Sequence, residues 1–206
     1  MRLLRPSSEA EMIAEFLGQE YASHDRYGAH IDECLVQEVV AVRRITEPDI
    51  GDPDANADRR RVLARYRGYD ADRESYLTDF PGAGVAWNWV ALTPAELLES
   101  KYNGYPGSEW MDLSQDTRDP RIAAERIMAG QVACPLVQTL IGLATRLRNG
   151  LAVPPPILVS ADAGQTRVTL EGHTRITAYA LAPETIPDDI NVILGTSPAI
   201  ANWDEY

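Results

Sequence analysis

The first 80 residues have a hydrophobic pattern of mainly helical spacing. Residues 7–22 predict an amphipathic helix. A mostly apolar run follows over residues 30–44, and its pattern leaves helix and strand both open. Residues 47–56 are rich in proline, glycine and aspartate, which predicts a loop, and residues 59–66 should be helical again. The apolar face of the first helix carries Met12, Ile13, Phe16 and Leu17.

Strands and helices are both predicted after Phe80–Gly84, where proline and glycine mark a boundary between residues 1–80 and residues 81–206. Thr93, Pro94 and Glu96 have the spacing of a helix start with a capping box. The remaining segments follow from alternation or helical spacing. Strands are predicted over 85–92, 157–160, 166–170 and 190–194, helices over 120–129, 136–149 and 176–182, and a loop over 101–109.

The charge of the chain argues against duplex nucleic acid as a partner. Its 206 residues carry a formal net charge of −12, whereas such proteins usually present a basic face. The basic cluster Arg59–Arg61 follows an acidic stretch, and we interpret it as a solvated helix face, with a local basic groove as the alternative. No apolar run is long enough to cross a membrane, and none resembles a secretory signal. We expect a cytoplasmic protein with reduced cysteines.

Several patterns resemble known sites but lack essential residues. Residues 52–58 begin like a calcium loop, but Ala57 and Leu63 replace the required glycine and glutamate. The histidines and cysteines do not have zinc-ligand spacing, and neither a P-loop nor a hydrolase elbow is present. Cys34 and His30 could share a helix face as a nucleophile pair, but we interpret them as a buried cysteine beside a surface histidine.

The most informative segment is Glu171-Gly172-His173-Thr174-Arg175, which joins a predicted strand to a predicted helix. Such a turn directs free backbone N–H groups and the positive end of the helix dipole toward a ligand. Glycine permits close approach of the backbone, and the three residues after it are donors suited to phosphate. The acid could hold a metal ion or accept a proton. The sequence therefore predicts an anion site, the alternative being an ordinary connection with an arginine salt bridge.

The region from Val85 to Leu194 resembles the ParB/sulfiredoxin superfamily, in which this turn carries a Gly-x-x-Arg signature that cradles nucleotide phosphates. The resemblance implies an α+β fold, with a small mixed β-sheet flanked by helices over residues 81–206. Residues 1–80 would then be a helical extension packed on this core. Thr174 departs from the second histidine of the free-serine kinase version. The reactive cysteine of sulfiredoxin falls at His173, and the helix-turn-helix of ParB is missing, so neither of those activities is expected.

The resemblance implies a kinase-like phosphotransferase or phosphohydrolase that uses ATP, ADP or CTP, with Mg²⁺, on a small molecule. In this hypothesis Glu171 acts as base or magnesium ligand, and His173 stabilises charge or transfers a proton. The phosphate-binding residues would be Gly172, Thr174, Arg175 and Arg118, for which a surface ion pair is the alternative. The candidates on the acceptor side are Glu99, Lys101 and Glu109.

Two other functions stay open from the sequence. One is a nucleotide-binding switch or partner-binding module without turnover. The other is a nuclease or DNA-binding protein, which the negative charge and the missing DNA-reading domain disfavour. The substrate and the oligomeric state are not predicted.

Overall fold

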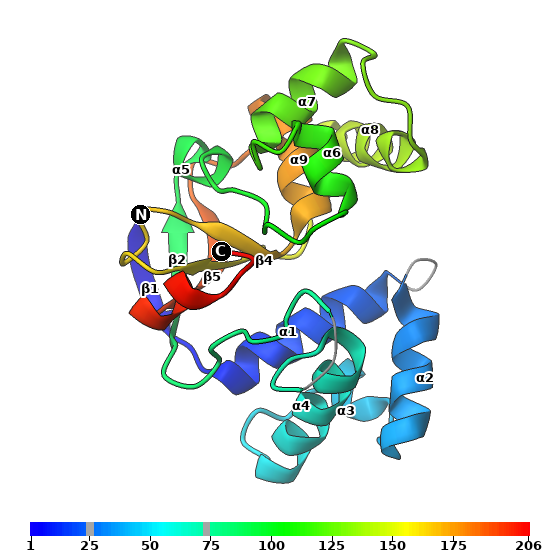
Figure 1. Cartoon of the computed structure of the whole chain (residues 1–206), viewed down its shortest axis with the longest axis vertical. Helices are drawn as coiled ribbons and strands as arrows, with labels where there is room; N and C mark the ends of the chain where they lie inside the picture. Colours follow the sequence, from blue (N-terminus) through cyan, green and yellow to red (C-terminus); the bar gives the residue numbers. More distant parts are fainter. Residues whose placement is uncertain (24–26, 72–74) are drawn as a thin grey trace. The chain divides into compact units, whose positions relative to one another are not determined.

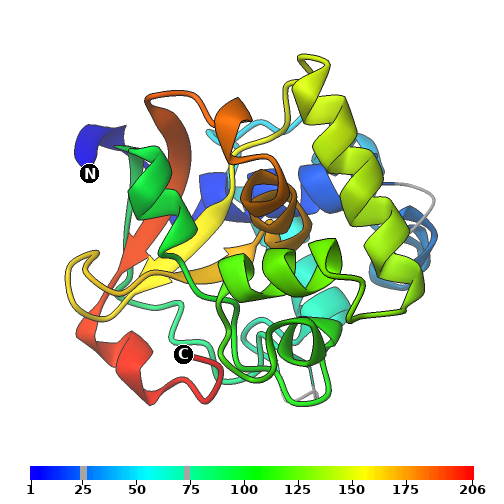
Figure 2. The same ribbon diagram turned by 90° about the horizontal axis from the view of Figure 1, so that it is seen from above.

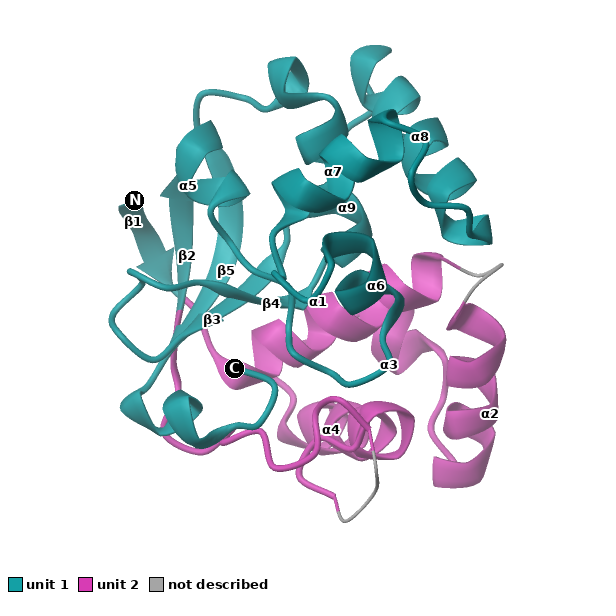
Figure 3. Ribbon diagram, turned by 45° about the horizontal axis from the view of Figure 1, so that its top comes forward, with its two compact units in different colours: residues 1–6, 88–206 teal, residues 7–87 magenta. Residues whose placement is uncertain are grey.

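The computed structural model describes residues 1–23, 27–71 and 75–206, and the chain folds as two compact units (Figures 1 and 3). Unit 1 consists of Met1–Pro6 and Asn88–Tyr206, and unit 2 of Ser7–Trp87. Unit 1 contains the sheet and the candidate site, whereas unit 2 is helical. None of the described helices combines the length and the apolar character that a membrane crossing requires.

A five-stranded mixed sheet forms the centre of unit 1, with the strand order β1-β2-β5-β3-β4 (Figure 1). Strand β1 is antiparallel to β2, and β3 is antiparallel to β4 but parallel to β5. This sheet and the helices around it confirm the predicted α+β fold. The strands are β1 (Arg2–Pro6), β2 (Ala86–Leu92), β3 (Ile157–Ser160), β4 (Val168–Glu171) and β5 (Ile190–Thr196).

The outermost strand, β1, has no counterpart in the sequence prediction. All five of its residues are exposed, so it lacks the alternation that marks a half-buried strand. Its pairing runs from Arg2 opposite Ala91 to Pro6 opposite Asn88. Just beyond this ladder, in unit 2, the N–H of Ser7 donates to the carbonyl of Trp87 at 2.9 Å.

The helices of unit 1 enclose an apolar core. Helix α9 contacts both α7 and α8 (Figure 2), and buried side chains from these helices pack with those of β2, β3 and β5. The predicted capping box of Thr93 and Glu96 is confirmed. Helix α6 and the short 3-10 helices were not predicted. The elements are α5 (Pro94–Leu98), α6 (Glu109–Ser114), α7 (Pro120–Met128), α8 (Pro135–Arg148), α9 (His173–Leu181), η2 (Pro183–Thr185) and η3 (Pro198–Asn202).

Unit 2 contains α1 (Glu9–Ala22), α2 (Ala29–Glu38), α3 (Arg43–Thr46) and α4 (Pro53–Arg67). The first helix was predicted, and the run left open at 30–44 is helical up to Glu38. The loop predicted over 47–56 is wrong in its second half. Asp52 accepts hydrogen bonds from the N–H groups of Asp54 and Ala55, and Pro53 occupies the first turn, so these residues start α4.

The basic cluster of α4 is only partly a solvated face. Arg59 is fully buried and donates to the carbonyls of Arg44 and Asp49, each at 2.9 Å, so the prediction is wrong for this residue. Arg60 and Arg61 do lie nearer the surface, where they form ion pairs with acidic residues. These ion pairs leave less unbalanced positive charge for the basic groove considered from the sequence.

Candidate functional site at the start of helix α9

The predicted strand-to-helix turn lies where β4 ends at Glu171 and α9 begins at His173. Gly172, between them, has φ 110° and ψ 17°, a left-handed conformation that favours glycine. No side chain caps this helix start. The first N–H groups of an α-helix have no acceptor within the helix, and at α9 they point out of its N-terminus.

Glycine at position 172 also leaves space for the side chain of Arg175. A Cβ atom on Gly172 would lie 2.9 Å from Nη2 and 3.2 Å from Nε of Arg175, and 3.2 Å from Cα of Pro156. The guanidinium therefore packs directly over the turn. The missing side chain lets it lie beside the open N-terminus of the helix.

Arg175 forms an ion pair with Glu171, in which Nη2 donates to Oε1 at 3.0 Å. Both side chains are largely buried, with 11% and 15% of their surface exposed. The Nε of Arg175 is buried and has no hydrogen-bond partner among the described residues. A buried donor without a partner is unfavourable, so this guanidinium retains an unused hydrogen bond beside the helix start.

His173 is packed into the wall of the turn rather than projecting from it. Its ring is stacked on Trp110, with centroids 5.3 Å apart, and lies 5.7 Å from the ring of Tyr102. Its Nε2 accepts a 3.4 Å hydrogen bond from the N–H of Asn103, and only 7% of the residue is exposed. Because Nε2 acts as an acceptor, it is unprotonated in this arrangement.

Two hydroxyl groups, those of Thr177 and Tyr102, are linked by hydrogen bonds to the first turn of α9. Thr177 donates to the carbonyl of His173 at 2.7 Å, and the hydroxyl of Tyr102 lies 2.5 Å from that of Thr177. Tyr102 is fully buried, and burial raises the pKa of its phenol, so the group stays protonated and serves as a donor. Sequence reasoning did not connect Tyr102 with the turn.

Backbone pairing with β4 brings Tyr102 to this place. Lys101 forms a parallel bridge with Val168. Its N–H donates to the carbonyl of Arg167, and its carbonyl accepts from the N–H of Thr169, both at 2.8 Å. The segment 101–103 therefore runs beside β4 toward the turn. No local sequence signal indicates a pairing between residues so far apart in the chain.

The three acceptor-side candidates have other surroundings. Nζ of Lys101 forms a 2.8 Å ion pair with Asp119, which also binds Arg121. The carboxylate of Glu99 is mostly exposed and lies 3.4 Å from Nη2 of Arg167. Glu109 is an exposed residue at the start of α6. Of these residues, only Lys101 belongs to the segment that continues to the turn.

Arg118, predicted to bind phosphate, instead holds the C-terminal segment. Its Nε donates to the carbonyl of Tyr102 at 2.7 Å. Its Nη1 and Nη2 donate to main-chain oxygens of Tyr206 and Glu205, at 2.7 and 3.1 Å. All three nitrogen atoms of this guanidinium thus donate to main-chain oxygens. In this arrangement Arg118 forms neither the surface ion pair nor the open anion site considered from the sequence.

Magnesium would find a limited set of protein ligands. No group of three or more histidine, cysteine, aspartate or glutamate side chains could hold a metal ion in the part of the chain that the structure describes; His24 lies outside it. At the turn, the nearest carboxylate is that of Glu171, and Arg175 binds it. Mg²⁺ often takes one or two carboxylates together with substrate phosphates. The residues therefore fit magnesium only if a phosphate supplies the other ligands.

Comparison of the chain with protein-family models, with curated proteins and with solved structures found no match. The resemblance to the ParB/sulfiredoxin superfamily consequently depends on the motif at residues 171–175 and on its place between a strand and a helix.

Proposed function

We propose that the turn at residues 171–175 binds the phosphate groups of a nucleotide, in a kinase-like transfer to a small molecule. The observation that carries this proposal is the Arg175 guanidinium beside the uncapped start of α9, whose buried Nε has no hydrogen-bond partner within the described part of the chain. A phosphate could accept from this Nε and from the first-turn N–H groups together. Gly172 makes room for the guanidinium itself, which lies where a Cβ atom on this residue would otherwise be.

Phosphate binding would change the state of Glu171. In the structure its carboxylate holds Arg175 at 3.0 Å, so it competes with any anion for the guanidinium. A phosphate that takes over Arg175 would release this carboxylate. Glu171 could then accept the proton of an acceptor hydroxyl, while that oxygen bonds to the terminal phosphorus and the bond to the leaving nucleotide oxygen breaks. Magnesium held mainly by the phosphates would neutralise phosphate charge, and a role of Glu171 as its ligand would be the alternative to its role as base.

His173 has a different part in this proposal from the one expected from the sequence. Its ring is packed between aromatic side chains and its Nε2 accepts from Asn103, which supports a positioning role rather than proton transfer. The same observation favours a second candidate, a nucleotide-binding switch without turnover. The two candidates share the phosphate site and differ in whether Glu171 acts as a base.

Calorimetric titration with ATP, ADP and CTP, with and without Mg²⁺, tests phosphate binding. Arg175→Ala should weaken binding by about 10- to 100-fold, because charged hydrogen bonds contribute about 1.5–3 kcal/mol. Arg146→Ala is the matched control, since Arg146 is an exposed arginine of α8 and its loss changes the charge equally. Failure of all three nucleotides to bind the unaltered protein would refute the proposal.

Glu171→Gln separates the two candidates. It preserves the shape of the side chain but removes the charge that competes for Arg175, so it should tighten nucleotide binding. If the protein is a phosphotransferase, the same variant should lose turnover, measured as ADP or CDP release with a panel of hydroxyl acceptors. Tighter binding also shows that the variant is folded. Turnover that is unchanged in Glu171→Gln would exclude Glu171 as the base.

A further inference from the structure

Helix α6 places an aromatic ring beside the phosphate site. The indole of Trp110, in the first turn of this helix, is stacked on the ring of His173, with an interplanar angle of 24° and centroids 5.3 Å apart. His173 is the first residue of α9, so the indole adjoins the turn at residues 171–175. Trp110 is only half-buried, whereas His173 and Tyr102, which pack against it, are buried. Part of the indole therefore remains exposed next to the turn.

The segment that carries Trp110 differs in charge from the turn. Residues 102–114 contain two acids, Glu109 and Asp112, and neither lysine nor arginine. Carboxylates repel phosphate, so this segment does not suit the charged end of a nucleotide. A base is uncharged and presents a flat π-face that stacks on aromatic side chains. The two neighbouring features therefore match the two ends of one nucleotide, with the phosphates at Arg175 and the base at Trp110.

Hydrogen bonds to the backbone of α6 hold Trp110 in place. Its carbonyl accepts a 2.8 Å hydrogen bond from the hydroxyl of Ser114, and the oxygen of this hydroxyl accepts from the N–H of Arg118 at 3.1 Å. Arg126 of α7 donates to two carbonyls near the end of the helix. A ring that is fixed before binding loses little conformational freedom when a base stacks on it, so α6 provides a pre-organised surface.

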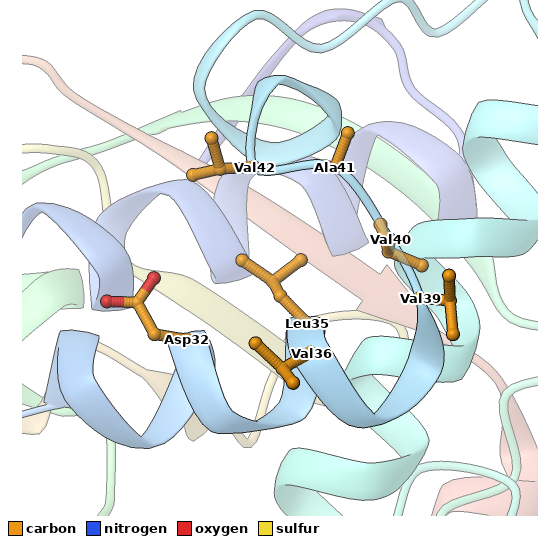
Figure 4. Close-up of a pocket in the computed structure, with 7 residues that line it drawn as sticks. All are labelled: Asp32, Leu35, Val36, Val39, Val40, Ala41 and Val42. Carbon is orange, nitrogen blue, oxygen red and sulfur yellow. The ribbon is translucent and has the colours of Figure 1, made fainter.

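A shallow hollow in unit 2 is less suited to a nucleotide. It has a volume of about 560 Å³ and lies at the end of α2 (Figure 4). Its lining consists of Asp32 and of aliphatic side chains between residues 35 and 42. Such a lining has no cation for a phosphate and no ring on which a base can stack. The start of α9 with its neighbour Trp110 has both.

We propose that the base of the bound nucleotide stacks on the exposed part of the Trp110 indole while its phosphates occupy the turn. This inference rests on the proposed function, since it assigns the other end of the same ligand. Trp110 then distinguishes a nucleotide from a polyphosphate that has no base. The indole contacts the base and not the reacting phosphate, so it determines binding rather than the chemical step.

The test compares ATP with inorganic tripolyphosphate, which has the phosphates but no base, by calorimetric titration of the full chain. Trp110→Leu keeps an apolar side chain beside His173 but removes the π-face. It should weaken ATP binding about 5- to 150-fold and leave tripolyphosphate binding unchanged, since stacking of a base on an aromatic side chain contributes binding of this order. Trp89→Leu is the matched control, because Trp89 is a half-buried tryptophan of β2 in the same unit that lies under the Arg5 guanidinium. It should change neither affinity.

Tryptophan fluorescence reports the contact directly. A base stacked on an indole quenches its emission, so ATP should reduce the fluorescence of the unaltered protein and of Trp89→Leu but not that of Trp110→Leu. Tripolyphosphate should have no such effect on any of the three. Quenching by ATP that persists in Trp110→Leu would contradict the inference.

The titrations also separate this inference from the proposed function. Equal weakening of ATP and tripolyphosphate by Trp110→Leu would overturn the inference, because Trp110 would then act by supporting His173 and the turn. Unchanged affinity for both ligands would overturn it as well, while the phosphate site would stand. If the unaltered protein binds neither ligand, the proposed function is refuted, and this inference is refuted with it.

Discussion

Replacement of Gly172 by alanine tests the central geometric argument about the turn. An L-residue held in a left-handed conformation costs about 1–2 kcal/mol. The new Cβ would also meet the guanidinium of Arg175 at 2.9 Å and the backbone of Pro156 at 3.2 Å. Because the backbone of Pro156 cannot easily yield, the guanidinium must move and weaken its bond to Glu171. Loss of a charged hydrogen bond adds about 1.5–3 kcal/mol.

Gly150→Ala provides the matched control. Gly150 also has a positive φ, 83°, but a Cβ atom there would meet nothing within 4 Å, so only the backbone cost applies. Both glycines belong to unit 1, so the same unfolding transition reports on both variants. Gly172→Ala should therefore lower the free energy of unfolding by about 1.5–3 kcal/mol more than Gly150→Ala. The assay is unfolding in guanidinium chloride followed by tryptophan fluorescence, with nucleotide titration of each variant. Equal destabilisation by both substitutions would refute the argument that the Arg175 guanidinium packs against the turn.

Three further predictions concern other residues. Burial raises the pKa of Asp119, but hydrogen bonds from Arg121 and Lys101 outweigh it and hold this pKa well below its ordinary value. The stability that this carboxylate adds is complete above about pH 4, and it is lost as the pH falls through the folded pKa. Asp119→Asn should therefore make the free energy of unfolding fall less steeply at acidic pH than in the unaltered protein. The same acid dependence in both proteins would contradict this. Arg118→Ala should lower the free energy of unfolding by about 1–3 kcal/mol and increase proteolysis of the C-terminal segment, while the affinity for nucleotide stays the same. Lost nucleotide affinity with unchanged stability would instead support the phosphate-binding role expected from the sequence. Val39 ends α2 with φ 55° and ψ 42°, in the left-handed region. Val39→Gly should raise the free energy of urea unfolding by about 0.5–1 kcal/mol, because relief of this strain exceeds the added entropy of the unfolded chain; a lower value would show that the backbone is unstrained.

The parts of the fold that were predicted are those determined by nearby residues. The capping box of Thr93 and Glu96 is a local arrangement, and so is the apolar face of α1. Strand β1 was missed because its residues are exposed on both faces and pair with β2 about 85 positions later. The start of α4 was missed for another reason. Asp52 and Pro53 occur in loops and at helix starts alike, and only the hydrogen bonds of Asp52 show which applies.

In the candidate site, too, the features set by nearby residues were predicted and those that depend on distant residues were not. Its turn could be located because a strand, a glycine and a helix follow one another, and the contact between Glu171 and Arg175 is an i, i+4 pair. The packing of His173 could not be foreseen, since Tyr102 and Trp110 reach it only through pairing of segment 101–103 with β4. The role of Arg118 likewise depends on the return of the C-terminal segment, which no local pattern indicates.

Strand β1 makes unit 2 an insertion within a β-hairpin. The chain leaves the sheet after Pro6 and returns at Asn88, its partner across the ladder, and Ser7 binds Trp87 just beyond. Closing so long a loop from a disordered chain would cost roughly 4 kcal/mol in entropy. If unit 2 folds first, it brings its own two ends together and meets this cost before β1 joins the sheet. A tight turn in place of Ser7–Trp87 should then preserve the hairpin, and with it the scaffold of the turn at residues 171–175.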